Sequence, residues 1–268
     1  MRPASFAALA ACVLLATPGH AAPSAAIKAA VANPARPDSE KPRDKYRHPA
    51  ETLSFFGVAP GQTLIEFSPG GGWYTHILMP LLAGNGHYIA LVRDRQREID
   101  NARALVATQP GGAVATVTPF DPAAATMAPP GSVDRVLTFR NIHNLFRPQD
   151  GGDAEGRVAA AFFQAAYKAL KPGGVLGVVD HRLPETVPAG REVASGYIKR
   201  STVIRLATAA GFRLAGESKI NANPKDTADW PNGVWTLPPT LSQGEKDRAR
   251  YLAIGESDRM TLRFVKPR

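Results

Sequence analysis

The sequence predicts an α/β fold whose central, mostly parallel sheet is covered by helices on both faces. Short apolar runs typical of buried strands alternate with segments whose apolar residues recur at helical spacing. Such alternation is typical of parallel sheets flanked by helices. A glycine-rich turn directly follows the first run, and 268 residues suffice for one domain with a substantial core.

The strands are predicted from apolar, β-branched runs that turn residues bound on both sides. The first run ends at the glycine-rich turn, and the last is reached only after a long connection. In chain order the strands are expected at 63–67, 87–92, 113–117, 133–139, 175–179, 212–218 and 260–265.

Helices are predicted where apolar residues fall on one helical face. A short helix begins at Pro49 and ends at Gly57, residue types that suit a first turn and a C-terminal cap. The strongest amphipathic pattern covers 159–170, and Lys-Pro-Gly-Gly ends it. Further helices are expected at 74–81, 99–106, 203–210 and 245–254.

The first 21 residues have the pattern of a secretory signal peptide. Arg2 supplies a positive start, residues 4–16 are apolar, and Ala21 offers a small residue at a cleavage point. The apolar run is too short to span a bilayer. We therefore expect a periplasmic or secreted protein with no transmembrane segment.

The only cysteine, Cys12, lies inside this segment. A lipobox is one interpretation of its surroundings, and a further small apolar residue is the simpler one. Cleavage leaves a mature chain without cysteine, which excludes disulfides, thiolate catalysis and cysteine-based metal sites.

Residues 22–47 are rich in Ala, Pro and charge, and we expect a flexible leader ahead of a domain that spans 48–268. The net charge is +9, but Lys and Arg are scattered and often alternate with acids. No aromatic-basic motif accompanies them, so a small-molecule ligand is expected rather than a nucleic acid. The oligomeric state is not indicated.

Residues 222–257 form a long connection before the last strand and carry Trp230 and Trp235. A connection this long in a compact domain is usually functional or disordered. One hypothesis is a lid over a ligand cleft, in which both tryptophans contact the substrate. A structural flap that seals one face of the sheet is the alternative.

The glycine-rich turn Ser68-Pro69-Gly70-Gly71-Gly72 lies between a strand and a helix. Glycine lets backbone pass close to a ligand, and a helix N-terminus presents free N–H groups. A plain tight turn is the alternative. The turn is neither a phosphate loop nor a regular dinucleotide-binding loop, because Gly-Lys-Ser/Thr and the third glycine are missing.

This turn, the Glu66 before it and the later Leu-Lys-Pro-Gly-Gly at 170–174 resemble the class I S-adenosylmethionine-dependent methyltransferases. The resemblance covers about residues 48–221. It implies a Rossmann-like fold with a final antiparallel strand. It also implies S-adenosylmethionine as the cofactor, held by Glu66, Ser68, Gly70, Gly71 and Gly72.

The whole chain is also similar to a family of exported, predicted methyltransferases. That similarity is carried by SPGGGWYT, FRNIHN, VDHR and NPKDT…GVWTLPP.

One departure from the methyltransferase pattern lies at the end of the second strand. An acid there holds the ribose in the wider fold, but this sequence has Val92. Asp94 is a candidate replacement, with a helix N-cap as the alternative. Asp121 is a candidate for the adenine, with a turn residue before Pro122 as the alternative.

A polar cluster follows the fourth strand, at the sheet edge where open α/β sheets bind ligands. Arg140, Asn141 and Asn144 are candidate substrate contacts, and His143 is a candidate base. A structural histidine is the alternative for His143.

Asp180 and His181 end the fifth strand at the same sheet edge and are further catalytic candidates. Neighbours in a strand point opposite ways, so Asp180 is expected to meet His143 or the substrate rather than His181. A polar strand exit is the alternative. No metal is expected, because the histidines lack the spacing of ligands.

The sequence thus favours a methyltransferase that acts on an unknown acceptor outside the cytoplasm. The alternative is a protein that binds an S-adenosyl compound or another small molecule and has no transfer activity. The export signal favours that alternative, because S-adenosylmethionine is made in the cytoplasm. A nicotinamide oxidoreductase is disfavoured by the glycine pattern.

Overall fold

The computed structural model describes residues 22–109 and 114–268, and every structural statement below concerns these residues. The predicted signal peptide, with Cys12 and its lipobox alternative, lies outside them. The predicted start of the third strand at Ala113 lies outside them as well.

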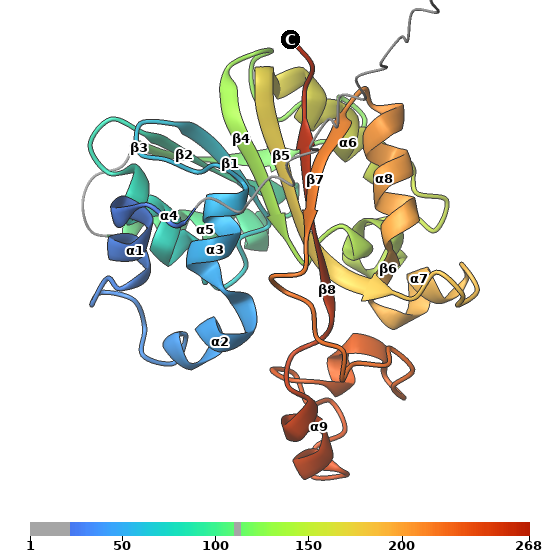
Figure 1. Ribbon diagram of the computed structural model, residues 1–268. Coiled ribbons are helices and arrows are strands. Elements are labelled where there is room, and N and C mark those ends of the chain that lie inside the picture. The colour runs from blue at the N-terminus through green and yellow to red at the C-terminus, as the bar shows by residue number, and fades with distance from the viewer. Residues whose placement is uncertain (1–21, 110–113) are drawn as a thin grey trace, which may run out of the picture.

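A single twisted sheet forms the centre of the fold, in the order β3-β2-β1-β4-β5-β8-β7, and β6 pairs with the end of β5 (Figure 1). The pairs from β3 to β5 are parallel, whereas β8 runs antiparallel to β5 and β7. The predicted fold, with its final antiparallel strand, is confirmed. The strands are β1 (Thr63–Phe67), β2 (His87–Arg93), β3 (Val114–Phe120), β4 (Val133–Phe139), β5 (Leu170–Leu183), β6 (Ile198–Lys199), β7 (Arg213–Ser218) and β8 (Arg259–Val265).

Helices cover both faces of the sheet, as Figure 1 shows. The α-helices are α1 (Ala25–Val31), α2 (Asp44–Arg47), α3 (Pro49–Phe55), α4 (Thr75–Leu82), α5 (Gln96–Ala107), α6 (Arg157–Ala169), α7 (Arg191–Ser195), α8 (Arg200–Ala209) and α9 (Arg248–Ile254). Four 3₁₀ turns in the described chain complete the set: η1 (Lys41–Arg43), η2 (His143–Phe146), η3 (Pro148–Asp150) and η4 (Gly233–Thr236).

Strand β1 shows how the sequence divides the core between the two faces. Successive side chains of a strand point to opposite faces. Leu64 therefore packs with α1, α3, α4 and α5, whereas Ile65 and Phe67 pack with α6 and α8. All three are essentially unexposed. Glu66 points to the same face as Leu64, where a charged side chain needs polar partners.

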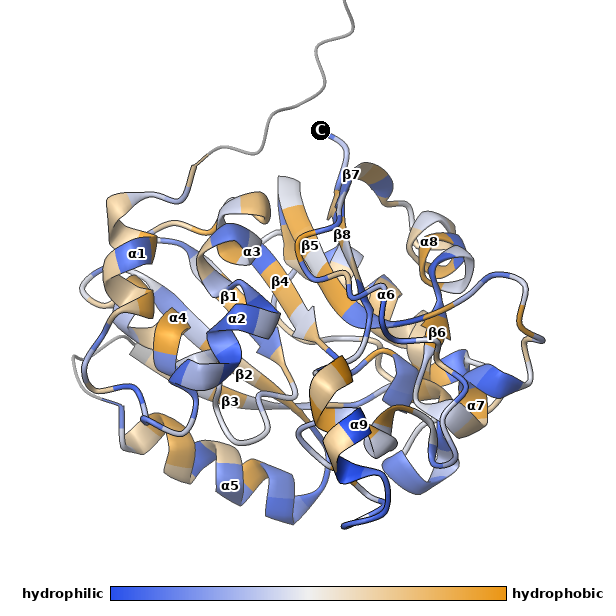
Figure 2. Cartoon of the chain, turned by 60° about the horizontal axis from the view of Figure 1, so that its bottom comes forward, coloured by the Kyte–Doolittle hydropathy of each residue, from blue (hydrophilic) through white to orange (hydrophobic). Residues whose placement is uncertain are grey.

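Residues 22–47 are not the flexible leader that their composition predicts. Helix α1 packs against α3 and α4, and Ile27 and Ala30 are buried in the core on that face. Figure 2 shows α2 as a hydrophilic helix, yet its Arg47 is buried. The prediction failed because ion pairs, rather than an apolar stripe, hold much of this segment in place.

Arg36 anchors the segment. Its side chain is fully buried, donates to both carboxylate oxygens of Asp44 at 2.8 and 2.9 Å, and donates to the Val31 carbonyl at 2.7 Å. Its guanidinium also lies 5.2 Å from the ring centroid of Trp73.

We expect Arg36→Ala to lower the free energy of unfolding by about 2–4 kcal/mol, because it removes a buried charge pair and leaves Asp44 without its partner. Denaturant unfolding measures this change, with Arg97→Ala on the exposed face of α5 as the control. A change below about 0.5 kcal/mol, the size typical of surface substitutions, would show that the segment contributes nothing to folding.

The long connection before β8 has a small apolar core of its own, formed by Leu183, Tyr197, Ala228, Trp230, Val234, Leu237 and Tyr251. In Figure 1 it projects, orange to red, beyond the end of the sheet where β5 ends and β8 begins. Asp226 organises it by accepting hydrogen bonds from the Tyr197 hydroxyl, the Trp230 indole and the Asp258 amide. No helix in residues 22–109 or 114–268 is long and apolar enough to cross a membrane.

Candidate functional site

The glycine-rich turn leaves open space beside its backbone. A Cβ added to Gly70 or Gly71 would meet no heavy atom within 4 Å, whereas one on Gly72 would lie 2.5 Å from Leu105. Gly70 and Gly72 also have positive φ angles, of 60° and 88°. Gly70 and Gly71 therefore line a cavity, and Gly72 is required by packing and backbone conformation. The structure does not place Gly72 at the cavity wall where we predicted it.

Glu66 is the next-to-last residue of β1, two residues before this turn begins, and is buried. Its Oε2 accepts hydrogen bonds from the Tyr88 hydroxyl at 2.7 Å and the Thr75 hydroxyl at 2.9 Å. Burial raises the pKa of Glu66 to about 7, although these two bonds and the charge of Arg140 favour the ionised form.

The raised pKa of Glu66 predicts how stability depends on pH. The Glu66 carboxyl stays protonated up to about pH 7 in the folded state but only up to about pH 4.5 in the unfolded state. This difference in proton binding stabilises the folded state below that window, and the stabilisation is lost as the pH rises through it. Glu66→Gln mimics the protonated form and can still accept both hydroxyl bonds. We expect it to be more stable than the wild type at pH 8 by up to about 3 kcal/mol, and the gap to close by pH 4.5. Equal differences at both pH values in denaturant unfolding would contradict this.

Two adjoining cavities lie at the carboxyl ends of β1, β2, β4 and β5. The smaller, of about 240 Å³, lies between the glycine turn and the end of β2. The larger, of about 650 Å³, extends from the turn to β4, β5, α2 and the long connection. Ser68, Pro69, Gly70 and Asn141 line both. An elongated ligand that crosses the turn would therefore enter both cavities.

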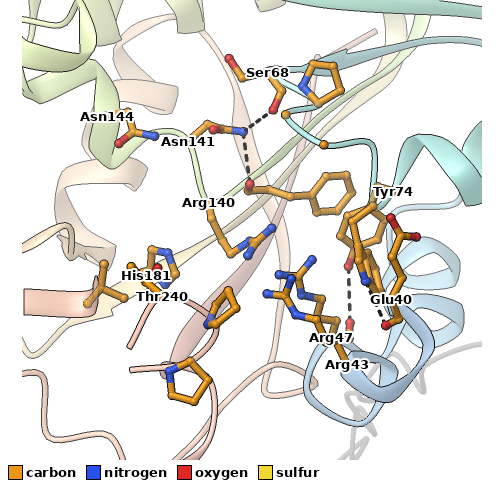
Figure 3. A pocket seen from close by; sticks show the side chains of 18 of the residues that line it. Glu40, Arg43, Arg47, Ser68, Tyr74, Arg140, Asn141, Asn144, His181 and Thr240 are labelled. Carbon is orange, nitrogen blue, oxygen red and sulfur yellow. Dashed lines mark hydrogen bonds between the residues drawn. The ribbon is translucent and has the colours of Figure 1, made fainter. Parts of the chain in front are cut away.

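Asn141 fixes the junction of the two cavities. Its Nδ2 donates to the carbonyls of Phe67, Ser68 and Phe139, and thereby ties the end of β1 to the end of β4 (Figure 3). Ser68 directly follows β1 and Arg140 directly follows β4, and both have left-handed backbone conformations, with φ of 50° and 64°. A residue other than glycine keeps such a strained backbone conformation only where surrounding contacts enforce it, and residues of this kind cluster at functional sites.

His143 and Asp180 form a buried pair at the ends of β4 and β5. The His143 Nδ1 lies 2.7 Å from the Asp180 Oδ1, and the Asp180 Oδ2 accepts from the His143 backbone N–H at 3.2 Å. Both side chains are at most 4% exposed. His143 lines the larger cavity, so Asp180 orients a histidine that faces a potential ligand.

His181 lies beside this pair, with its ring centroid 5.0 Å from that of His143. Its Nδ1 is 2.5 Å from the Ser257 hydroxyl oxygen. Burial, followed by the electrostatic effects of His143 and Arg259, holds the pKa of His181 well below its usual value. His181 is therefore neutral at neutral pH.

The fold brings together a set of potential metal ligands that spacing along the sequence did not indicate. His143, Asp180 and His181 each offer one ligand atom within 4.8 Å of the others, although Asp180 follows His143 by 37 residues. The positive charges of the arginines around His181 would repel a metal cation held by these three residues. The arrangement suits proton transfer better than metal binding.

Arginines from the N-terminal segment line the larger cavity, and our sequence analysis missed them. Arg43 and Arg47 both pair with Glu256, at 2.7 and 3.2 Å. Arg259 pairs with the same carboxylate at 2.5 Å. Burial would raise the pKa of Glu256, but the charges of Arg259, Arg47, Arg140 and Arg43 hold it at about 2. The short Asp-Lys-Tyr-Arg-His-Pro run, basic and aromatic before a helix, was the available signal.

The other substrate candidates fall into two groups. Arg140, Asn144 and Trp235 line the larger cavity with Asn141. Trp235 also stacks under the Arg147 guanidinium, 4.1 Å from its ring centroid. Trp230 lies instead in the small core of the long connection, packed edge-on against Tyr251. Its large apolar surface is buried in that core, and Trp230 is not among the residues that line the larger cavity, where we predicted a substrate contact.

The two acids predicted to hold the adenosyl group lie on the surface. Asp94 is exposed, and the residues that line the smaller cavity beside it are Arg93 and Glu98. Asp121 is exposed and accepts a hydrogen bond from the Ala123 backbone N–H, so it is the turn residue of the alternative interpretation. Glu98, which pairs with Arg93 at 2.9 Å, is the carboxylate that sequence reasoning overlooked.

Comparisons with known proteins bear on the fold. No family model and no curated protein matches the sequence. Among solved structures, an S-adenosylmethionine-dependent methyltransferase of Aquifex aeolicus has a TM-score of 0.55 at 15% identity, over 84% of this chain and 92% of its own. An arsenic(III) S-adenosylmethionine methyltransferase of Chlamydomonas reinhardtii has a TM-score of 0.52 at 15% identity, over 92% of this chain and 75% of its own.

The [4+2]-cyclase SpnF is also similar, with a TM-score of 0.51 at 14% identity, over 81% of this chain and 78% of its own. At such identities the likeness concerns the fold alone. The chain therefore has the Rossmann-like fold of these methyltransferases, and the reaction must be argued from the site.

Proposed function

We propose that this protein is an S-adenosylmethionine-dependent methyltransferase with an acceptor site in the larger cavity. The observation that carries the proposal is the meeting of the two cavities at the glycine turn, with the His143–Asp180 pair lining one of them. Methyltransferases among the structurally similar proteins support the same assignment.

The residues beside the turn fit such a cofactor. The open space at Gly70 and Gly71 is a cradle that a side chain would fill. Glu98 lines the smaller cavity, which supports giving it the role that we predicted for Asp94, acceptance of hydrogen bonds from the ribose hydroxyls. When bound, S-adenosylmethionine supplies a methyl group that its sulfonium already activates, so the protein need only align the acceptor and remove its proton.

His143 is the proposed base. Asp180, as an ionised carboxylate, accepts from a protonated His143 Nδ1 and leaves Nε2 as the acceptor nitrogen. In the transfer, the acceptor oxygen or nitrogen would bond to the methyl carbon while the bond from that carbon to sulfur breaks and S-adenosylhomocysteine leaves. The proton of the acceptor would pass to His143 Nε2, and the Asp180 charge would stabilise the imidazolium. Neutral His181 beside it adds no competing positive charge.

The experiment is an incubation of the purified protein with S-adenosylmethionine and a panel of small acceptors that carry hydroxyl or amine groups. Acceptor-dependent formation of S-adenosylhomocysteine supports the proposal. Binding without turnover for every acceptor favours the second candidate, a binding protein of the same fold. The end of β2 is the observation in favour of that candidate, because Val92 stands where the wider fold has an acid and the next residue, Arg93, brings a cation to the smaller cavity.

We also propose that the protein acts outside the cytoplasm, as its first 21 residues and its similarity to exported, predicted methyltransferases suggest. N-terminal sequencing of material exported from a bacterial host is expected to begin at Ala22. Exported material that begins at Met1 would contradict the proposal.

A further inference from the structure

Positively charged side chains gather at the larger cavity, which Arg43, Arg47 and Arg140 line, and Arg259 lies behind them on their shared partner Glu256. Four guanidinium groups, those of Arg43, Arg47, Arg140 and Arg259, act together on the single carboxylate of Glu256. Figure 3 shows the Arg140 and Arg47 guanidinium groups gathered in the cavity, with Arg43 beside them. Burying like charges so close together is costly unless an anion offsets them.

The donors of these arginines are only partly used. Arg47 is 1% exposed, and its Nη1 and Nη2 have no hydrogen-bond partner within the described chain. The Arg43 Nη2 is likewise buried without one. The Arg140 side chain forms no hydrogen bond or ion pair with any residue that the structure describes, although strained backbone holds it at the cavity. Buried donors of this kind are normally satisfied, so their pattern points to a missing anionic partner.

Resting on the proposed function, we infer that the acceptor carries an anionic oxygen group, a carboxylate or a phosphate, which Arg47 and Arg140 bind in the larger cavity. The N–H forks of two arginines suit the oxygen atoms of either group. The site belongs to the acceptor because Arg43, Arg47 and Arg140 line only the larger cavity, together with His143. An anion held there brings the rest of the acceptor beside the base.

The test compares wild type, Arg140→Met, Arg140→Lys and a control, Arg103→Met, which removes an exposed arginine of α5. Melting temperatures are measured in chloride, in phosphate and in acetate at equal ionic strength. Phosphate or acetate should stabilise the wild type and the control, and the more effective anion identifies the group. Calorimetric titration with that anion should give a dissociation constant at least about tenfold weaker for Arg140→Met.

Stability separates this role from a structural one. Without an anion, Arg140→Met should melt about 2–4 °C above the wild type, because it removes a half-buried, unpaired charge that lies near other arginines. A structural arginine would instead lower the melting temperature when replaced. If Arg140→Met does not fold, Arg140→Lys still tests the site, because it keeps the charge and loses the fork, and weaker anion binding is again expected.

S-adenosylhomocysteine distinguishes the acceptor from the cofactor. Arg140→Met should bind it within about threefold of the wild type. A loss equal to the loss of phosphate or acetate binding would assign the arginines to the carboxylate of the cofactor and overturn the inference. No stabilisation of the wild type by either anion would overturn it too. A wild type that binds the anion but no S-adenosylhomocysteine would instead contradict the proposed function.

Discussion

Gly71→Leu is expected to weaken S-adenosylhomocysteine binding by at least about 100-fold without unfolding the protein. Gly71 has no positive φ, so its backbone accepts a side chain. A Cβ there meets no heavy atom within 4 Å, and Gly71 lines the larger cavity, so a longer side chain has room beside the turn. The leucine would occupy the volume that the cofactor needs, while the core remains untouched.

Gly190→Leu is the matched control. Gly190 lies before α7 with a φ of −58°, and an added Cβ also meets nothing within 4 Å. It should bind S-adenosylhomocysteine as the wild type does, in calorimetric titration, with an unchanged melting temperature. Full affinity in a folded Gly71→Leu protein would place the ligand elsewhere. Gly72→Val is a poorer test, because its Cβ would collide with Leu105 and disturb the fold itself.

His143→Gln is expected to lower the rate of methyl transfer by about 10²–10⁴-fold, the usual contribution of a positioned base. Glutamine can still donate to Asp180 but cannot take the proton of the acceptor. Formation of S-adenosylhomocysteine with an acceptor found in the panel measures this rate.

The matched control for that variant is His87→Gln. His87 begins β2 at the opposite end of the sheet and lies 3.3 Å from the Thr116 hydroxyl. This variant should keep the wild-type rate, and His143→Gln should keep its affinity for S-adenosylhomocysteine. A rate for His143→Gln within about threefold of the wild type would remove His143 from the role of base.

The sequence was sufficient to predict most strands of the sheet because local patterns determine where strands and helices form. Apolar runs, a glycine turn and helical periodicity are properties of neighbouring residues, and all were visible in the sequence. The placement of Asp180 beside His143 was also within reach. Strand alternation favoured His143 or the substrate over His181 as its partner, and the carboxyl ends of adjacent parallel strands lie together.

The remaining parts of the site depend on contacts between distant segments. Arg47 lines the cavity and pairs with Glu256, 209 residues later, a contact that no local pattern reveals, and composition made its segment look disordered. Trp230 and Trp235 look alike in sequence, but Asp226 holds the indole of Trp230 inside the long connection. Glu98, and not Asp94, lines the smaller cavity. The first turn of α5 sets the direction of these side chains.

Calorimetric titration of the mature wild-type protein with S-adenosylhomocysteine tests the central claim most directly. The two cavities that meet at the glycine turn predict saturable one-to-one binding, its loss in Gly71→Leu, and no comparable binding of NAD. The absence of heat from S-adenosylhomocysteine in a folded protein, or equal binding by wild type and Gly71→Leu, would contradict the assignment of these cavities to the cofactor and its acceptor.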